Sequence, residues 1–368
     1  MSKIKIDYNG FLNSSGYSQA AQNYISALNK TNLYDIRFSL FGNKPNRPAV
    51  SDNKYSFFME LCRKKFNNDN SILQIYHCIP PLQKRIKKLQ KNIGFGIFET
   101  FDVPENWIEI LNQNDAVIVP SLFNYKIFGH SKLNKPLYHI PHCLDMDLYN
   151  DKVLPSQKFD KFTFLFMGTW KKRKGIFLLI EAWCNEFTEE DDNVQLIIKT
   201  DKPKIAEGYI ERYIKKINKK GIAPIIVENK ILSEEEIPAF LRTHNCLVSP
   251  SMGEGFGLPP IQCMALKIPI IVTDFSGVQD YATESTANLI QNEGFVQLAD
   301  MDGIPQFKRK KWAFITVKSI QQKMRYVLEN QEEVKKKAIN GYDFVHKNFN
   351  YTVIANKFSD MIKEVYGS

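Results

Sequence analysis

The stretch LVSPSMGEGFGLPPIQCMALKIPIIVTDFSG, residues 247–277, decides the fold of this chain. It reads as an apolar strand, a loop that contains Gly253, Gly255 and Gly257, a helix that begins at one of two prolines, and a second apolar strand. Closely spaced glycines let a backbone turn sharply and approach a ligand, and the free N–H groups of a helix start point into the loop. The pattern predicts a cradle for a phosphate or a sugar nucleotide. The carboxylate of Glu254 in its middle is unusual for a site that binds only phosphate.

Length and composition indicate a globular protein with two domains. The chain has 368 residues, more than one hydrophobic core usually supports. Its hydrophobic content of 43% and charged content of 24% are those of a packed globular protein. The longest apolar runs fall short of the roughly 20 residues that span a bilayer, and the N-terminus lacks the features of a signal peptide. We therefore expect a cytoplasmic protein.

The cysteines and the charge narrow the possible partners. The six cysteines are scattered and never paired at zinc-site spacing, which favours buried, reduced thiols. The net charge of +9 favours an anionic partner such as a nucleoside diphosphate, a lipid surface or nucleic acid. Nucleic acid is disfavoured because no recognition module or interleaved aromatic and basic pattern appears. Two Asp-Met-Asp triplets, 145–147 and 300–302, follow no strand of a nucleotide-binding unit, so chance explains them better than a metal site.

Apolar strands alternate with helices along most of the chain. The first series opens with a strand at 4–12, a Ser-rich loop that contains Gly16, and a helix at 19–30, which is the order of a Rossmann-like unit. A second alternating series starts at 161, after a polar stretch at 143–160 that reads as a linker. Such alternation predicts two parallel sheets, each covered by helices on both faces.

Several motifs of the sequence resemble those of a known protein family. PSMGEGFGLPPIQCMA followed by IPIIVTDFSG, with FLFMGTWKKRKGIFLLIEAW before them, closely resembles the C-terminal domain of family four retaining glycosyltransferases, also called group 1. NGFLNSSGYSQAAQNYISAL resembles their glycine loop and first helix, and GFGIFETFDVPENW with VPSLFNYKIF and HIPHCLDMDLY resembles one branch of the family. The resemblance implies the α/β GT-B fold, in which two Rossmann-like domains face a central cleft. An acceptor-side domain of residues 1–155, completed by a returning helix at 351–368, would then precede a donor-side domain of residues 156–350.

The family signature in the donor domain is a Glu, seven residues, and a second Glu. The first matches Glu254, which in the family touches the hydroxyls of the donor sugar. The second position holds Gln262, a departure, and the family uses this Glu to accept hydrogen bonds from the ribose. An amide oxygen still accepts such bonds, with a loss on the order of 1 kcal/mol. Further residues expected to shape donor binding are Gly255, Phe256, Gly257, Leu258 and Ile231.

The resemblance also implies two cations on the diphosphate. Lys174 matches the family's Lys, but Thr169 stands where its Arg is expected. The missing charge must come from Lys171, Lys172 or Arg173, or the diphosphate is less well neutralised. Positive charge here would affect the rate as well as binding, because the leaving diphosphate must be stabilised as the glycosidic bond opens. The alternative is an ordinary run of solvated charges.

Candidates in the first half of the chain are less well defined. Gly16 is expected to bring loop amides near the diphosphate. Many relatives carry a catalytic His at the end of the strand that here reads IGFGIFET, where this chain has Phe98 and Glu99, so Glu99 is the catalytic candidate. His77, at the end of the preceding strand, is a neighbouring candidate, with a purely structural hydrogen bond as the alternative.

The segment LQKRIKKLQK, residues 82–91, reads as a basic amphipathic helix. Its lysines would surround an apolar stripe, so it is a candidate for peripheral contact with an anionic membrane. The alternative is a surface helix whose apolar stripe packs on the sheet.

We therefore expect a metal-independent, retaining hexosyltransferase without a cofactor. Its donor would be a nucleoside diphosphate sugar of the UDP or GDP type, and its acceptor a glycan, a lipid-linked molecule or a protein. The departures Thr169 and Gln262 motivate the alternative of a non-catalytic GT-B subunit that acts as a scaffold or partner of an active transferase. A nicotinamide dehydrogenase is less favoured, since GxGxxG is absent from the first strand-to-helix turn. The sugar, the base and the acceptor are not specified by any motif.

Overall fold

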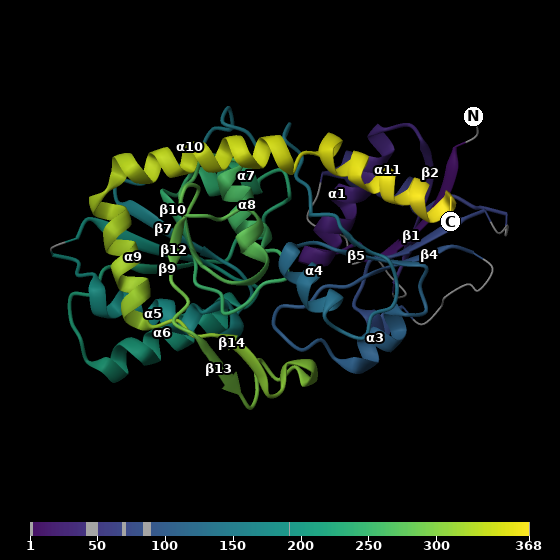
Figure 1. Cartoon of the computed structure of the whole chain (residues 1–368). Coiled ribbons are helices and arrows are strands. Elements are labelled where there is room, and N and C mark those ends of the chain that lie inside the picture. The colour runs from purple at the N-terminus through teal and green to yellow at the C-terminus, as the bar shows by residue number, and fades with distance from the viewer. Residues whose placement is uncertain (1–2, 42–50, 68–70, 84–89, 191, 368) are drawn as a thin grey trace. The chain divides into compact units, whose positions relative to one another are not determined.

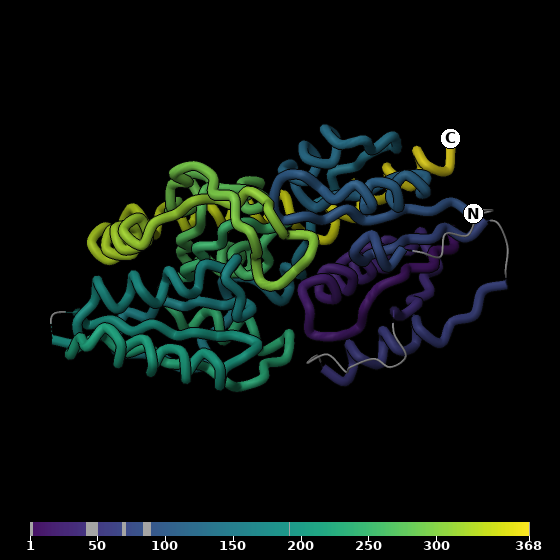
Figure 2. Tube along the Cα trace, turned by 90° about the horizontal axis from the view of Figure 1, so that it is seen from below, coloured from purple at the N-terminus to yellow at the C-terminus, as the bar shows by residue number. Residues whose placement is uncertain are grey.

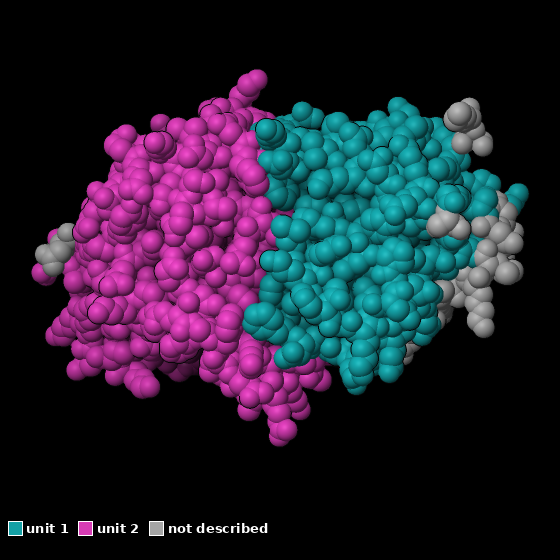
Figure 3. Space-filling view, in the orientation of Figure 1, with its two compact units in different colours: residues 1–147, 232–235, 346–368 teal, residues 148–231, 236–345 magenta. Residues whose placement is uncertain are grey.

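The structure of the chain is a computed structural model that divides into two compact units. The residues that it describes are 3–41, 51–67, 71–83, 90–190 and 192–367. Unit 1 comprises residues 1–147, 232–235 and 346–368, and unit 2 comprises residues 148–231 and 236–345 (Figure 3).

Unit 1 is built on a parallel six-stranded sheet with the order β2-β1-β3-β4-β5-β6 (Figure 1). The strands are β1 (Ile4–Gly10), β2 (Tyr34–Leu40), β3 (Leu73–Tyr76), β4 (Asn92–Phe95), β5 (Ala116–Val119) and β6 (Leu137–His139). The helices are α1 (Gly16–Lys30), α2 (Asp52–Arg63), α3 (Glu105–Leu111), α4 (Leu122–Gly129) and α11 (Tyr351–Gly367), with a 3-10 turn η1 (Pro80–Leu82). Strands β3, β4 and β5 are buried along their whole length, as in a parallel sheet covered on both faces, and the burial includes the polar Gln74 and Asn92.

The last helix of the chain, α11, packs on the first one within unit 1. Tyr24 of α1 meets Phe358 of α11 edge to face, with ring centroids 5.5 Å apart. The hydroxyl of Tyr351 donates to Oδ1 of Asn23 at 2.9 Å. The helix expected to return to the N-terminal domain therefore does so, and its buried face completes the core of unit 1.

Unit 2 repeats the architecture with the parallel order β12-β11-β10-β7-β8-β9. The strands are β7 (Phe162–Met167), β8 (Val194–Lys199), β9 (Ile225–Glu228), β10 (Cys246–Ser249), β11 (Ile270–Thr273) and β12 (Asn288–Ile290). The helices and 3-10 turns are η2 (Lys172–Lys174), α5 (Ile176–Glu186), α6 (Pro203–Ile217), α7 (Ile237–Arg242), α8 (Leu258–Met264), η3 (Ser276–Asp280), η4 (Pro305–Phe307), α9 (Val317–Glu329) and α10 (Gln331–Asn348). An antiparallel hairpin, β13 (Phe295–Leu298) and β14 (Lys310–Ala313), extends beyond this sheet (Figures 1 and 2).

The unit boundaries differ by a few residues from those expected at 155 and 350. Residues 148–155 belong to unit 2 because their side chains bind there: the hydroxyl of Tyr149 accepts a hydrogen bond from Nε2 of Gln262 at 3.0 Å. Residues 232–235 belong to unit 1, where Glu234 pairs with Nζ of Lys54 at 2.6 Å. These polar contacts join segments that are distant in the sequence, so no local sequence pattern predicts them.

Two predicted helices differ from the elements in the structure. The helix expected at 19–30 begins at Gly16, because the Ser15 side chain accepts from the Ser18 N–H and caps the helix three residues earlier. Of the basic helix predicted at 82–91, residue 82 ends a 3-10 turn, residues 83, 90 and 91 are not helical, and residues 84–89 lie outside the described part of the chain. The membrane contact expected of this segment remains a prediction from the sequence.

All six cysteines are free thiols, five of them buried, in agreement with the expectation of reduced cysteines. None of the helices in the described residues combines the length and the apolarity that crossing a bilayer requires.

Unit 1 encloses two histidines among aromatic rings. Nδ1 of His77, directly after β3, lies 2.8 Å from the Tyr8 hydroxyl, and its ring stacks on Phe95 with centroids 4.0 Å apart. Nδ1 of His142 lies 3.0 Å from the Tyr24 hydroxyl. Burial lowers the pKa of His142 to about 3 and that of His77 well below its usual value, the latter also through His142. These contacts support the structural alternative for His77.

We expect unit 1 to lose stability as the pH falls below about 6.5. Both imidazoles have lower pKa values when folded than when unfolded, so their contribution is present above the unfolded value and is lost on acidification. The surrounding Tyr8, Tyr24 and Cys143 have raised pKa values and stay neutral in this range. Thermal unfolding by circular dichroism at several pH values, with hydrogen exchange of the β3 peptide to identify the unit, measures this loss.

The control for this prediction is His130→Gln, which removes an exposed histidine of the same unit and should follow the wild-type pH profile. His142→Asn should flatten the profile. Equal acid sensitivity of wild type and His142→Asn would contradict the assignment to the buried pair.

Candidate functional site

The loop between β10 and α8 is held in one conformation by a tyrosine and a glycine. The Tyr281 hydroxyl lies 2.9 Å from the carbonyl oxygen of Phe256 and 2.7 Å from that of Gly257. Gly257 has φ of 91°, and a Cβ at this position would come within 2.7 Å of the Tyr281 hydroxyl oxygen. Glycine is therefore required here both by the backbone conformation and by the available space.

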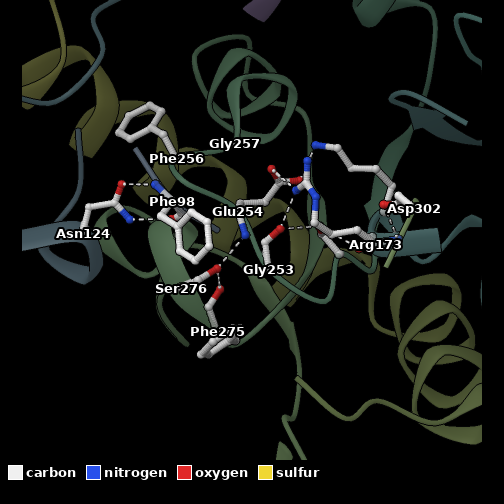
Figure 4. Close-up of polar contacts among 12 residues, drawn as sticks. Phe98, Asn124, Arg173, Gly253, Glu254, Phe256, Gly257, Phe275, Ser276 and Asp302 are labelled. Carbon is white, nitrogen blue, oxygen red and sulfur yellow. Dashed lines mark hydrogen bonds and ion pairs between the residues drawn. The ribbon is translucent and has the colours of Figure 1, made fainter. Parts of the chain in front are cut away.

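Glu254 is fixed through its backbone by the turn that follows β11 (Figure 4). Its N–H donates to Oγ of Ser276 at 2.8 Å, and its carbonyl accepts from the N–H of Gly277 at 3.0 Å. Ser276 is fully buried with φ of 68°. A Cβ at position 277 would lie 2.3 Å from the carbonyl oxygen of Gly255, so the two loops touch backbone to backbone. The backbone of Glu254 is therefore held in one position, which limits where its side chain can lie.

Two cations meet the Glu254 carboxylate. Nζ of Lys174 lies 2.5 Å from Oε1, and Nη1 of Arg173 lies 3.3 Å from Oε2. The same Nη1 donates to the carbonyl oxygen of Gly253 at 2.6 Å, as Figure 4 shows. The side chains of Glu254, Lys174 and Arg173 are 10%, 18% and 12% exposed. The three charges therefore interact in a largely desolvated place, where electrostatic forces are strong.

The charge balance at this site is positive. Burial raises the pKa of Glu254, but the charges of Lys174 and Arg173 outweigh it and lower the pKa to about 2. The carboxylate is thus ionised at neutral pH and offsets only one of the two cations. A second source of positive potential is the N-terminal dipole of α5. This helix begins at Ile176, shortly after the basic run, residues 171–174.

Gly175 makes this arrangement possible. Its φ is 70°, and a Cβ there would lie 1.9 Å from the carbonyl oxygen of Pro250. The close approach brings the basic run against the glycine loop, and the N–H of Met252 donates to the carbonyl oxygen of Arg173 at 2.8 Å. A larger residue at position 175 would separate the two segments.

The other donor-side candidates also lie in unit 2. Gly255 and Phe256 are buried, and the Phe256 ring packs edge to face on Tyr281, with ring centroids 5.4 Å apart. Leu258 is the partly exposed first residue of α8, and Ile231 is 83% exposed in the segment after β9. Gln262, 1% exposed, uses Nε2 to bind the Tyr149 hydroxyl.

Gly16 and Glu99 belong to unit 1. Gly16 is exposed at the first position of α1, where its amide is among those without an intrahelical partner. Glu99 is partly exposed in the bend after β4. The preceding Phe98 is clamped by Asn124, which accepts from its N–H at 3.1 Å and donates to its carbonyl oxygen at 2.7 Å (Figure 4).

Sequence reasoning missed two residues that shape the site. Ser276 supports the Glu254 backbone, and the carboxylate of Asp302 accepts from the N–H of Lys172 at 2.6 Å. The latter contact joins residues 130 positions apart, and Asp302 lies in a triplet that was attributed to chance. Among the described residues no group of three or more His, Cys, Asp or Glu side chains is arranged to hold a metal ion.

Part of the chain is similar to a known family. Residues 161–301, which contain Lys174, Glu254 and Gln262, match the family described as Glycosyl transferases group 1. The chain is 27% identical over 131 residues to alpha-D-kanosaminyltransferase of Streptomyces kanamyceticus, covering 36% of this chain and 32% of that one. It is 25% identical over 243 residues to the human alpha-1,3/1,6-mannosyltransferase ALG2, covering 55% of this chain and 56% of that one. The matches thus span less than two thirds of these relatives.

The fold has close counterparts among solved structures. Sucrose-phosphate synthase from Thermosynechococcus elongatus superimposes with a TM-score of 0.70 and 15% sequence identity, covering 99% of this chain and 100% of that one. At 15% identity this similarity concerns the fold alone, that is, the arrangement of two units with parallel sheets. Residues 161–301 thus resemble group 1 glycosyltransferases, and the chain as a whole has the GT-B fold.

Proposed function

We propose that this protein is a retaining, metal-independent glycosyltransferase that moves a hexose from a nucleoside diphosphate sugar to a glycan, a lipid-linked acceptor or a protein. One observation carries the proposal: the Glu254 carboxylate, in a glycine loop after β10, holds Lys174 and Arg173 on its two oxygens. Ligands of parallel sheets bind at the carboxyl ends of their strands, where this loop lies. A cytoplasmic location remains a prediction from the sequence.

The positive surplus suits a diphosphate. When the donor binds, its phosphate oxygens compete with Glu254 for the two cations, and the carboxylate oxygens become available to the sugar hydroxyls. As the bond between the anomeric carbon and the β-phosphate oxygen breaks, negative charge collects on the leaving diphosphate. Lys174 and Arg173 stabilise that charge in a site that excludes much of the water, where preorganised charges are most effective.

The position of Arg173 supports it as the substitute for the Arg that the family motif has at position 169. Thr169 is exposed and carries no charge, whereas Arg173 provides a second cation at the same carboxylate as Lys174. The absence of Arg at position 169 is therefore a weaker argument for a non-catalytic subunit.

Gln262 fits the ribose role as an acceptor. Its Nε2 donates to the Tyr149 hydroxyl, which orients the carboxamide, and Oε1 is the atom that can accept from a ribose hydroxyl. The bond would be weaker than one to a carboxylate. Gly16 and Glu99 are assigned to the reaction on the sequence resemblance alone, Gly16 through its backbone amide and Glu99 as a side chain of the acceptor-side domain.

Glu254→Ala and Lys174→Ala should each lower turnover by on the order of a hundredfold or more, because each removes a group that acts on the sugar or the leaving group. Donor hydrolysis across UDP, GDP and ADP sugars first identifies the donor, and the variants are then compared on it. Lys172→Ala is the matched control: it removes an exposed lysine from the same run and should keep most of the activity. Near-normal transfer by both variants with an intact fold would show that the site is assigned wrongly.

Arg173→Ala should lower kcat/KM by about tenfold or more, since a charged hydrogen-bonding partner of the leaving group is lost. Adding Thr169→Arg should restore part of the loss by returning the cation to its usual position in the family. A double variant no better than Arg173→Ala would argue against this exchange of positions.

Calorimetric titration with UDP and GDP tests the non-catalytic alternative. Micromolar binding with slow donor hydrolysis supports the enzyme, whereas a wild-type protein that binds no nucleotide supports a scaffold.

A further inference from the structure

A turn in the β13–β14 connection reaches the basic run of the site. The connection joins the two hairpin strands through the turn at residues 300–303 and the 3-10 turn η4. The family match ends at residue 301, so most of this connection lies outside it. The residues of the connection that contact η2, Asp302 and Phe307, lie outside the matched segment.

Asp302 binds the backbone of the run. Oδ1 accepts from the N–H of Lys172 at 2.6 Å, Oδ2 lies 3.4 Å from the N of Arg173, and the Asp302 carbonyl oxygen accepts from Nζ of Lys171 at 3.3 Å. These amides open η2, whose N-cap Lys171 supplies no side-chain hydrogen bond. First-turn amides lack intrahelical partners, so Asp302 acts as the cap of this turn from a distant part of the chain.

The same connection also contacts the Arg173 side chain. The guanidinium carbon lies 6.0 Å from the centre of the Phe307 ring, at the outer limit of a cation–π contact. Phe307 is 5% exposed and packs edge to face on the fully buried Trp312 at 4.9 Å. Arg173 thus lies between a fixed aromatic ring and the oxygens of Gly253 and Glu254.

We propose that Asp302 is a positioning residue for nucleoside diphosphate binding. By fixing the backbone of Lys172 and Arg173, it holds the Arg173 and Lys174 side chains where they meet Glu254. A long basic side chain that is already ordered loses less conformational entropy when the diphosphate binds, which raises affinity. This inference rests on the proposed function of the site and deepens it.

The backbone at Asp302 allows a clean test. Its φ of 61° lies in the left-handed region, which Gly adopts freely and Asn tolerates. Asp302→Gly therefore removes the carboxylate without backbone strain. Asp302→Asn keeps the conformation and one acceptor, but places an NH2 group where the second acceptor was.

The experiment compares a nucleoside diphosphate with its nucleoside. UDP, GDP, uridine and guanosine are titrated by calorimetry against wild type, Asp302→Gly and Asp302→Asn, with the melting temperature of each variant recorded. For the diphosphate that wild type binds, Asp302→Gly should weaken affinity by about tenfold and Asp302→Asn by about threefold. Affinity for the matching nucleoside should stay within about twofold, because it lacks the phosphates that Arg173 and Lys174 contact.

The matched control is Asp300→Gly. Asp300 lies in the same turn and accepts from the N–H of Gly303 at 3.1 Å, so this variant removes an equal charge and a turn contact. It should bind the diphosphate like wild type. A loss as large as that of Asp302→Gly would assign the effect to the charge of the turn and overturn the positioning role.

The remaining outcomes separate this inference from the proposed function. If wild type binds UDP or GDP and Asp302→Gly binds it equally well, or loses diphosphate and nucleoside alike, only the positioning role is wrong. If wild type binds neither, the proposed function fails and this inference with it. Should Asp302→Gly not fold, Asp302→Asn decides: a diphosphate-specific loss supports the role, and unchanged binding overturns it.

Discussion

The contact of one buried carboxylate with two cations is the interaction on which the site depends. Glu254 is ionised because Lys174 and Arg173 lower its pKa to about 2 against the opposing effect of burial. Without the cations the carboxylate would be costly to bury, and without the carboxylate the two cations would repel each other in a desolvated place. The arrangement stores two positive charges close together and keeps them ordered. An anionic ligand that carries more negative charge than one carboxylate can then bind both cations in place of Glu254.

Backbone geometry is what allows this contact. The basic run and the glycine loop approach each other so closely that position 175 has no room for a Cβ beside Pro250. The turn after β11 comes equally close to the glycine loop, so position 277 has no room for a Cβ beside Gly255. Each of these glycines is explained by a specific neighbour in the other segment. The Ser276 hydroxyl then holds the N–H of Glu254. The side chains of the site can be polar and charged because the backbone under them is so closely constrained.

The two units put buried polar groups to different uses. In unit 2 the charges of Glu254, Lys174 and Arg173 contact one another and leave one positive charge in excess. In unit 1 the buried His77 is a neutral member of an aromatic core, with Tyr8 and Phe95 as partners. The position of His77 at the end of a strand had made it a functional candidate, yet its burial and low pKa are those of a structural group. Strand ends carry both kinds of residue, and only packing tells them apart.

The sequence by itself determined the alternation of strands and helices, the parallel sheets, the glycine loop, and Glu254 and Lys174 as candidate site residues. These are expressed in local periodicity and in a motif that occupies contiguous positions. Only the tertiary structure decided that Arg173 contacts the same carboxylate as Lys174, that residues 148–155 belong with unit 2, and that Asp302 caps the basic run. The physical reason is that the contacts of Glu254 with Lys174 and of Asp302 with Lys172 span 80 and 130 positions. Contacts over such distances leave no local pattern in the sequence, and the turn that carries Asp302 reaches the basic run only through the packing of the folded chain.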